Sequence, residues 1–276
     1  MCAQYYGSTR FSVHSPGDLS WRISKDSAAA YAPKLFSAER MRLRSDVFLN
    51  LALPVYATWA ERFEYRHIVH FSSDLPRQWR AGLETAAEQF PFLLLDEVEG
   101  ACDPREMIRG DMIRAGRSDG PVVWFRVDDD DVLAADYLES LDSFASADHM
   151  GYAVSFGLGI AAVYEQGRHR DFRFMRQLLP SAGQAYIGEF NAESGALSGL
   201  EAGPHDKVDA LRPVILDSRE PMYLQTHHRH QDKAFGKDED HLVRHNRHQD
   251  SVDCGTLVKK FPTIARSDPA DRPTSS

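Results

Sequence analysis

Residues 121–131 constrain the fold of this chain more than any other stretch, because they read PVVWFRVDDDD. From Val122 to Val127, five of six residues are apolar and three are valines, a pattern typical of a short buried strand. The strand runs directly into four consecutive aspartates, whose mutual repulsion gives folding alone no reason to place them there. A hard divalent cation gives a reason, because Mg²⁺ and Mn²⁺ bind carboxylate oxygens together with substrate phosphates. Ligands in open α/β sheets bind just outside the carboxyl ends of strands, so the sequence predicts a ligand site at residues 128–131.

The aspartates have a simpler alternative explanation. They could form a solvated acidic turn that caps a following helix, with Asp131 near the N-cap. A single aspartate suffices for a cap, and here there are four. We therefore favour the metal site.

The composition limits the class of protein and of partner. A chain of 276 residues can bury one large core or at most two small ones. Its 42% hydrophobic and 26% charged residues are typical of a globular protein. The net charge of −9 argues against a general nucleic-acid binder, which usually carries a basic excess. It does not argue against a small anionic ligand held by local basic groups.

The cysteines and the apolar runs bear on the compartment. Cys2, Cys102 and Cys254 are widely separated and odd in number, which fits a reduced cytoplasmic protein better than a disulfide scaffold. No run of 18 apolar residues exists, and the first residues lack the basic and apolar regions of a signal peptide. We predict a cytoplasmic protein without a transmembrane segment.

The N-terminal half alternates predicted strands and helices. Strands are expected at 9–13, 65–71, 92–95 and 122–127, and helices at 37–62 with a break near Pro54, at 77–89, at 103–115 and at 132–144. Asp103 is the expected N-cap of its helix and Pro104 the first helical residue. This alternation predicts a parallel sheet with helices on its faces.

After Asp148 the pattern changes to short strands with glycine-containing connections. Strand candidates are 151–157, 159–164, 171–174, 185–190, 213–216 and 222–225, with a loop at 193–203. The C-terminal half is therefore expected to be a mixed sheet that shapes an acceptor pocket. No linker separates the two halves, so the fold class is α/β in a single domain.

Histidines form a second feature of the chain. His227, His228 and His230 follow an apolar strand, and a neutral imidazole can ligate Mn²⁺ or Zn²⁺. For these three, metal ligation and a role without a metal both remain open. Solvated side chains explain the later histidines, His241, His245 and His248, more simply. A dedicated zinc site is disfavoured because neither a Cys-x-x-Cys pair nor a His-Glu-x-x-His helix is present.

Basic residues and carboxylates supply further candidates. A diphosphate requires positive charge or helix N-termini, and arginines near strand ends or helix starts are Arg10, Arg44, Arg77 and Arg126. A group transfer to a hydroxyl requires a base, and the candidates in the C-terminal half are Glu189, Glu193 and Asp206. Neither a Gly-x-Gly-x-x-Gly motif nor a phosphate loop is present, which disfavours dinucleotide redox and P-loop chemistry. Gly-x-Ser-x-Gly is also absent, which disfavours an α/β-hydrolase.

Several segments together resemble a known family. A β-α-β-α half that ends in Asp-x-Asp, with a later histidine, is similar to GT-A-type glycosyltransferases, and most similar to the bacterial rhamnosyltransferase family. The matching segments, spread over about residues 9–232, are Arg10-Phe11 in the first strand, Arg44 and Phe48 through Leu53-Pro54, FSSDLP at 71–76, RVDDDD at 126–131 and PMYLQTHHR at 221–229. Two departures from the family pattern are Tyr223 in place of Trp and Arg229 in place of Gly.

The resemblance implies a GT-A-like domain over residues 1–264. Residues 9–130 would bind the nucleotide sugar, 131–264 would bind the acceptor, and 265–276 would be a disordered tail. The implied reaction displaces a nucleoside diphosphate from the sugar's anomeric carbon through an oxocarbenium-like transition state, with Mn²⁺ or Mg²⁺ stabilising the leaving group.

The resemblance also assigns roles to individual residues. Asp128 would contact the ribose or base, Asp130 would bind the metal with help from Asp131, and His228 would be the later metal or diphosphate ligand. The donor-contacting residues are then Arg10, Phe11, Ser72, Arg126, Asp128 and Asp129. For the general base, Asp206 is the first choice and Glu189 the second.

The leading hypothesis is a metal-dependent, inverting glycosyltransferase with a small-molecule or saccharide acceptor. Two alternatives are a nucleotide-sugar-binding protein without turnover and a nucleotidyltransferase-like enzyme. Fold alone does not decide between them.

Overall fold

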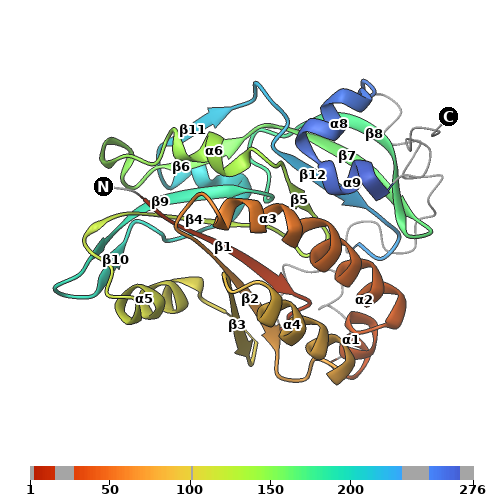
Figure 1. Cartoon of the computed structure of the whole chain (residues 1–276), viewed down its shortest axis with the longest axis horizontal. Helices are drawn as coiled ribbons and strands as arrows, with labels where there is room; N and C mark the ends of the chain where they lie inside the picture. The colour runs from red at the N-terminus through yellow and green to blue at the C-terminus, as the bar shows by residue number, and fades with distance from the viewer. Residues whose placement is uncertain (1–2, 16–27, 101, 232–248, 268–276) are drawn as a thin grey trace.

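A computed structural model describes residues 3–15, 28–100, 102–231 and 249–267 (Figure 1). The main sheet has the strand order β11-β6-β9-β4-β1-β2-β3, with β10 added beside β9. Its strands are β1 (Gln4–Phe11), β2 (Tyr65–Ser72), β3 (Leu93–Val98), β4 (Gly120–Arg126), β6 (Ala153–Phe156), β9 (Gln184–Asn191), β10 (Ala196–Ser198) and β11 (Val214–Asp217). The predicted α/β fold class is confirmed.

The N-terminal half of the sheet is parallel and the C-terminal half is mixed. β1 lies between β2 and β4 and runs parallel to both, and β2 runs parallel to β3. β9 is antiparallel to β4 and to β6, whereas β6 and β11 are parallel. The carboxyl ends of β1, β2 and β4 therefore meet at one edge of the sheet, which is where ligands bind in such folds.

Helices cover both faces of this sheet. α2 (Ala38–Ser45), η2 (Asp46–Ala52), α3 (Leu53–Ala60) and α4 (Arg77–Gln89) contribute to the larger hydrophobic core on one face. α5 (Pro104–Arg114) lies on the other face, where Ile108 and Met112 pack with Trp124 and Tyr186 (Figure 1). Side chains that alternate along a strand therefore enter two different environments.

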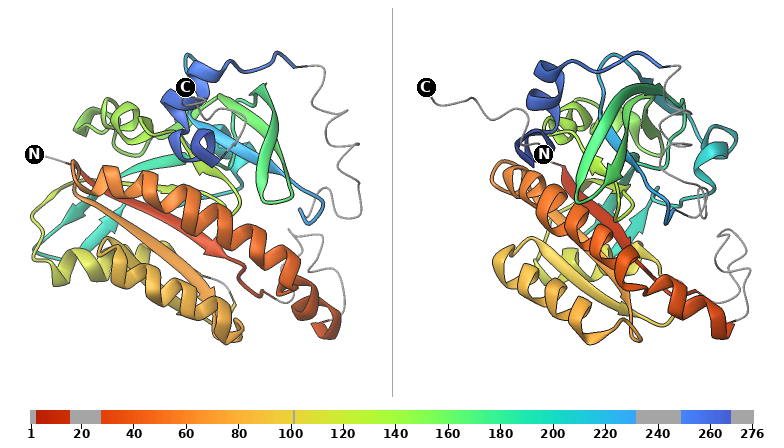
Figure 2. Two further views of the ribbon diagram at one scale, coloured as in Figure 1. Left: turned by 45° about the vertical axis from the view of Figure 1, so that its right-hand side comes forward. Right: turned by 90° about the vertical axis from the view of Figure 1, so that its right-hand side faces the viewer.

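A second sheet with the order β5-β12-β7-β8 completes the domain. Its strands are β5 (Val132–Leu133), β7 (Leu158–Glu165), β8 (Arg168–Arg176) and β12 (Tyr223–His227). The remaining helices are α1 (Ala28–Leu35), α6 (Tyr137–Asp142), η3 (Ala147–His149), η4 (His205–Ala210), α8 (Cys254–Lys260) and α9 (Pro262–Ser267). The views in Figure 2 show the β7–β8 hairpin beside α8 and α9.

The helix at residues 38–60 has no break at Pro54. The chain passes from α2 into the π-helix η2 and then into α3, where Pro54 is at the start. A proline at the first turn of a helix costs little, because the N–H that it lacks would have no partner inside that helix. The expected break is thus a change of helix type.

The helix expected at 132–144 is wrong over its first five residues. Val132 and Leu133 form β5 instead, paired antiparallel with Leu224 and Tyr223, and the helix begins at Tyr137. Both residues are fully buried, so pairing with a distant strand and burial in the core outweigh the local helical pattern. The loop expected at 193–203 likewise contains the short strand β10, paired with β9.

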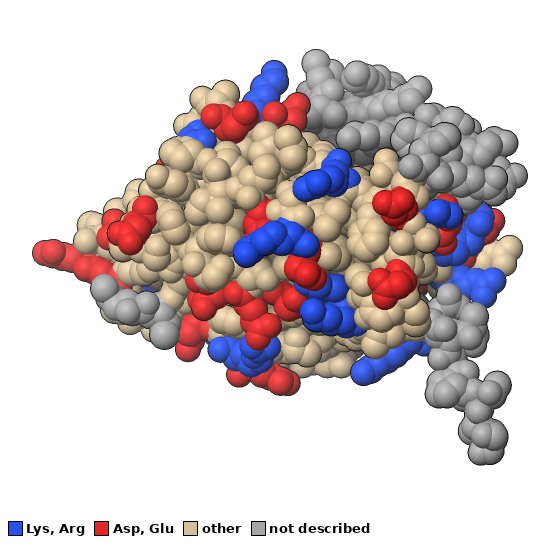
Figure 3. All heavy atoms as spheres, turned by 90° about the horizontal axis from the view of Figure 1, so that it is seen from above, with Lys and Arg blue, Asp and Glu red and all other residues tan. Residues whose placement is uncertain are grey.

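Other expectations are met or fall outside the described part. α4 and α5 occupy the predicted ranges, and Asp103 caps α5 by accepting a hydrogen bond from the Arg105 N–H. Residues 265–267 of the predicted tail belong to α9, and 268–276 lie outside the described residues. Among the described residues no helix is long and apolar enough to cross a membrane. On the face in Figure 3, acidic and basic side chains are interspersed.

Candidate active site

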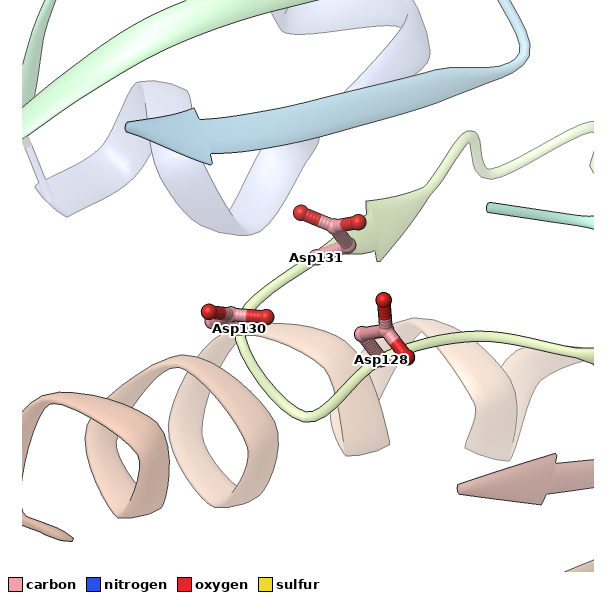
Figure 4. Close-up of side chains that lie close together, drawn as sticks. All are labelled: Asp128, Asp130 and Asp131. Atoms are coloured by element: carbon pink, nitrogen blue, oxygen red, sulfur yellow. The ribbon is translucent and has the colours of Figure 1, made fainter. Parts of the chain in front are cut away.

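Three aspartates come together on the loop that joins β4 to β5. Carboxylate oxygens of Asp128, Asp130 and Asp131 all lie within 4.8 Å of one another. Figure 4 shows the three side chains along this loop, with β12 on one side. The loop leads into β5, so Asp131 caps no helix and the alternative explanation of the acidic run is wrong. The sequence therefore correctly predicted a carboxylate cluster at the end of a buried strand.

Asp130 is held by two basic side chains. Its Oδ2 atom forms an ion pair with Arg44 Nη2 at 2.9 Å and accepts a hydrogen bond from His228 Nε2 at 3.0 Å. Burial raises the pKa of Asp130, but the charge of Arg44 and the hydrogen bond from His228 outweigh burial and hold the pKa well below its ordinary value. Asp130 is therefore ionised, and within the described part of the chain its Oδ2 atom makes the contacts with Arg44 and His228.

His228 is oriented by the backbone of its own segment. Its Nδ1 atom accepts a hydrogen bond from the His230 N–H at 3.2 Å, so the proton of the neutral ring is on Nε2 and points at Asp130. Burial lowers the pKa of His228 to about 4, against an opposing effect of Asp130. In this arrangement His228 donates to a carboxylate. Direct ligation of a metal by Nε2 would require the other tautomer, and that role stays a prediction.

Burial and electrostatic repulsion within the cluster raise the pKa of Asp131. Its Oδ1 atom accepts a hydrogen bond from the Thr226 N–H at 3.1 Å, which ties the loop to β12. Burial, followed by the charges of Asp130 and Asp128, raises the pKa of Asp131 well above its ordinary value. A divalent cation binds deprotonated carboxylates and would relieve this repulsion. Three clustered oxygen donors are a set that suits Mg²⁺ or Mn²⁺.

Asp129 turns away from the other three. Its Oδ2 atom accepts hydrogen bonds from the Ser12 backbone N–H at 3.0 Å and from Ser12 Oγ at 3.3 Å, and its Oδ1 atom pairs with Arg44. Ser12 has a positive φ of 50°, a conformation that non-glycine residues rarely adopt. Arg40 donates to Ser12 Oγ at 2.8 Å from the other side. Asp129 thus fixes the turn after β1, and a role in holding the donor stays a prediction.

The family model described as "Putative rhamnosyl transferase" matches residues 4–237. The chain belongs to this family. Membership confirms the resemblance inferred from the motifs between Arg10 and Arg229.

Solved structures give more distant similarities. Staphylococcus aureus TarS 1–349 is 11% identical, with 81% of this chain and 60% of that chain covered and a TM-score of 0.36. Its complex with UDP is 10% identical, with 93% of this chain and 66% of that chain covered and a TM-score of 0.38. A "putative nucleotide-diphospho-sugar transferase" of Desulfovibrio desulfuricans G20 is 13% identical, with 92% of this chain and 100% of that chain covered and a TM-score of 0.31. The chain thus spans less than two-thirds of the two TarS chains. Among curated proteins no match is found.

The other residues that the rhamnosyl transferase resemblance assigns to the donor site lie at the same edge of the sheet. Phe11 is fully buried against Phe48, at 5.9 Å between ring centroids, so it belongs to the core. Ser72 Oγ accepts a hydrogen bond from the His14 N–H at 2.6 Å. Arg10 is exposed at the end of β1, in register with His70 of β2. Donor contacts for all three stay predictions.

The candidate bases lie at opposite ends of the sheet. Asp206 is exposed in η4, whose His205 carbonyl accepts a hydrogen bond from Gln184 Nε2 at 3.0 Å. Gln184 is in register with Arg126, so η4 is at the end of β4 that carries the aspartates. Glu189 is opposite Pro121, five residues back along β4, or roughly 17 Å away at the usual rise per residue. Glu193 follows β9 at that remote end.

The two departures from the rhamnosyl transferase pattern fall in different environments. Tyr223 is 1% exposed, and its ring lies so close to Gly159 that a Cβ there would be 2.3 Å from it. Arg229 is exposed and pairs with Glu39 at 3.1 Å. The first change therefore concerns packing inside the second sheet, and the second concerns the surface beside α2.

Sequence reasoning missed Ser12, Arg40, Thr226 and His169. His169 is 2% exposed, and its Nε2 atom lies 3.0 Å from Thr226 Oγ1. No local signal marks these residues, because each acts through a contact across the fold. The histidines at 241–248 lie outside the described residues.

Proposed function

We propose that this protein transfers a sugar from a nucleoside-diphosphate sugar to an acceptor hydroxyl, with metal assistance and inversion at the anomeric carbon. The observation that carries the proposal is the cluster of Asp128, Asp130 and Asp131 at the end of a buried strand in a member of the rhamnosyl transferase family. Asp130 and Asp131 would hold Mn²⁺ or Mg²⁺, and Asp128 would contact the nucleotide. The bound metal would stabilise the negative charge on the departing diphosphate as a Lewis acid.

The chain's own residues prepare this site. Arg44 and His228 fix Asp130 in its ionised form, and the Thr226 N–H fixes Asp131. Because all of these side chains are buried, the carboxylates keep their positions as the ligand arrives, which reduces the reorganisation that accompanies reaction. Arg10, exposed at the end of β1, would meet the negative charge of the nucleotide.

The acceptor hydroxyl needs a base as its oxygen attacks the anomeric carbon. Asp206 would accept that proton while the bond from the sugar to the diphosphate breaks. Its support is its position in η4, at the end of the sheet that carries the aspartates. Glu189 lies at the remote end and is less suited. A saccharide or other small-molecule acceptor and a cytoplasmic location remain predictions.

The first test is calorimetric titration of UDP, GDP and dTDP with and without Mn²⁺. We expect one nucleotide to bind in a metal-dependent way and binding to be lost in Asp130→Ala. Asp148→Asn removes an exposed carboxylate in η3, outside the aspartate cluster, and serves as the control. If no nucleotide binds to the wild-type protein under either condition, the proposal fails.

A second measurement separates an enzyme from a binding protein. Asp206→Asn should keep metal-dependent nucleotide binding and lose release of nucleoside diphosphate in the presence of acceptor. A wild-type protein that binds nucleotide but never turns it over would favour the alternative without turnover. Release of pyrophosphate in place of nucleoside diphosphate would favour a nucleotidyltransferase-like enzyme.

A further inference from the structure

Arg126 has an unusual environment for a half-buried cation. It is the last residue of β4, and by alternation along the strand its side chain lies on the α5 face with Trp124. Its Nε and Nη2 atoms are buried and have no hydrogen-bond partner among the residues that the structure describes. Among the described residues no carboxylate forms an ion pair with it. Buried donors without a partner are costly, so a ligand group that accepts from this edge of the guanidinium would stabilise it.

A second guanidinium, that of Arg212, lies near the same aromatic side chains. The Arg212 Cζ atom lies 5.1 Å from the centroid of the Tyr186 ring, which stacks on Trp124 at 5.1 Å. Burial raises the pKa of Tyr186, whereas the charges of Arg126 and Arg212 both lower it, so both cations face this phenol. The nitrogens of Arg212 donate to the carbonyls of Gly199 and Glu201, which are uncharged partners. An acidic side chain, that of Glu201, lies 3.7 Å from Arg212 at an exposed position.

Polar side chains lie beside Arg126. Gln184 is in register with Arg126, and Ser8 faces it from β1. The Tyr186 hydroxyl donates to Gln184 Oε1 at 2.7 Å, and Trp124 Nε1 donates to Ser8 Oγ at 2.9 Å. The surroundings of Arg126 are therefore polar, aromatic and positively charged. A guanidinium in such surroundings matches a carboxylate or a phosphate group, which it binds with two parallel hydrogen bonds.

The position distinguishes this anion from the donor diphosphate. Arg44 and the backbone of Thr226 approach the aspartates from α2 and β12, whereas Arg126 lies on the α5 face of the sheet. The element next to Arg126 on that face is η4, joined through the hydrogen bond from Gln184 to the His205 carbonyl. η4 also carries Asp206. The anionic group would therefore belong to the acceptor, whose hydroxyl attacks the sugar.

We propose that Arg126, assisted by Arg212, forms an anion-binding subsite that selects an acceptor carrying a carboxylate or phosphate group. The acceptor assignment rests on the proposed function, whereas anion binding by Arg126 does not. The subsite adds a charge requirement to the acceptor, so a neutral sugar alone is a poor substrate. Arg126 would then recognise the acceptor, in place of the donor contact that the family resemblance implies for it.

The test compares sugars that differ in charge. D-Glucose, D-glucuronate and D-glucose 6-phosphate are titrated into wild-type protein, Arg126→Gln, Arg126→Lys and the control Arg168→Gln, each with and without Mn²⁺ and the nucleotide that binds. Arg168 is exposed at the β7–β8 turn, so its variant removes the same charge at the surface. Circular dichroism and the melting temperature establish that each variant is folded.

We expect wild-type protein to bind an anionic sugar on the order of tenfold to a hundredfold more tightly than glucose, as a charge-assisted hydrogen bond to a buried group implies. Arg126→Gln should abolish that preference, and Arg126→Lys should retain part of it. The arm with glucuronate and the arm with glucose 6-phosphate show whether carboxylate or phosphate is preferred.

Three outcomes would overturn the inference. One is equal binding of neutral and anionic sugars by the wild-type protein. Another is an equal loss of anion preference in Arg168→Gln. The third is loss of nucleotide binding in Arg126→Gln, which would make Arg126 a donor ligand. Failure of the proposed function gives a different result, because then no nucleotide binds to the wild-type protein while the anion preference still depends on Arg126.

Discussion

The two faces beside the end of β4 differ in how their charges are balanced. On the α2 face, Asp129 and Asp130 are buried against Arg44, and Asp131 accepts a backbone N–H from β12. On the α5 face, the Nε and Nη2 atoms of Arg126 have no hydrogen-bond partner among the described residues. The contacts within this part of the chain therefore satisfy most of the acidic side and only part of the basic side. An imbalance that the chain itself does not resolve indicates where a ligand of the opposite charge completes the structure.

The comparison also separates residues that build the site from residues that await a ligand. Asp129 and Asp130 are neighbours in sequence, yet both oxygens of Asp129 contact Ser12 or Arg44, while the Oδ2 atom of Asp130 makes its contacts with Arg44 and His228. Two aspartates that are adjacent in the sequence thus have different roles. The predictions below use this difference, beginning with the largest effect.

Replacing Asp130 should have the largest effect on turnover. Asp130→Ala is expected to lower kcat/KM by about 10³-fold, because it removes a metal ligand whose cation stabilises the leaving diphosphate. Initial rates of nucleoside diphosphate release at saturating Mn²⁺ measure the loss. Asp148→Asn is the matched control and should keep the wild-type rate. A rate for Asp130→Ala within tenfold of wild type would remove Asp130 from the metal site.

Breaking the Arg44 contacts should chiefly reduce stability. Arg44→Met leaves Asp129 and Asp130 buried without their cation, and removing one partner of a buried pair costs about 3–5 kcal/mol. Urea unfolding of Arg44→Met and of the double variant Arg44→Met/Asp129→Asn measures this cost. We expect the double variant to recover part of the loss, because one of the two uncompensated charges is gone. Independent, additive losses would show that Asp129 does not depend on Arg44.

The buried side chain of His169, next to Thr226, predicts that the stability of the protein depends on pH. Burial, and then the neighbouring His228, lower the pKa of His169 from 6.5 to about 3. The unfolded chain therefore binds a proton that the folded chain excludes in that interval. The resulting stability is fully present above pH 6.5 and is lost as the pH falls, at up to about 1.4 kcal/mol per pH unit.

Urea unfolding at pH 7, 5.5 and 4.5 measures this slope. His169→Gln keeps a hydrogen-bonding group near Thr226 and should make the free energy of unfolding less dependent on pH. His149→Gln, which changes a half-buried histidine outside this network, is the control. An unchanged slope in His169→Gln would contradict the assignment of this pH dependence to His169.

The sequence predicts the strands and helices around the end of β4 better than it predicts the contacts between distant segments. Alternating strands and helices predict β1 to β4 with α4 and α5, because the hydrophobic pattern of each element is local. The end of β4 is equally clear, since its valines and aspartates are adjacent. The pairing of Val132 with Leu224 is not local, and neither is the contact of Asp130 with His228. Such contacts depend on the relative placement of distant strands, which periodicity does not specify.

The same limit explains the two predicted bases. Asp206 and Glu189 are both carboxylates in the C-terminal half, and nothing in their local sequence ranks them by distance from the aspartates. The antiparallel register of β4 and β9 does, because it places Glu189 opposite Pro121 and Gln184 opposite Arg126. Strand register is set by the core-facing pattern of both strands together, so it is visible only in the folded chain.

The smallest expected effect concerns Glu189, and it tests the register directly. Glu189→Gln removes an exposed carboxylate at the remote end of β4, and surface substitutions of this kind usually change stability by less than about 0.5 kcal/mol. We expect kcat/KM within twofold of wild type, whereas Asp206→Asn should lose on the order of 10²-fold or more as the base of the reaction. Initial rates for both variants under the same donor and acceptor concentrations give the comparison. A large loss in Glu189→Gln with little change in Asp206→Asn would move the acceptor to the other end of the sheet. The anion subsite at Arg126 would then lose its connection to transfer.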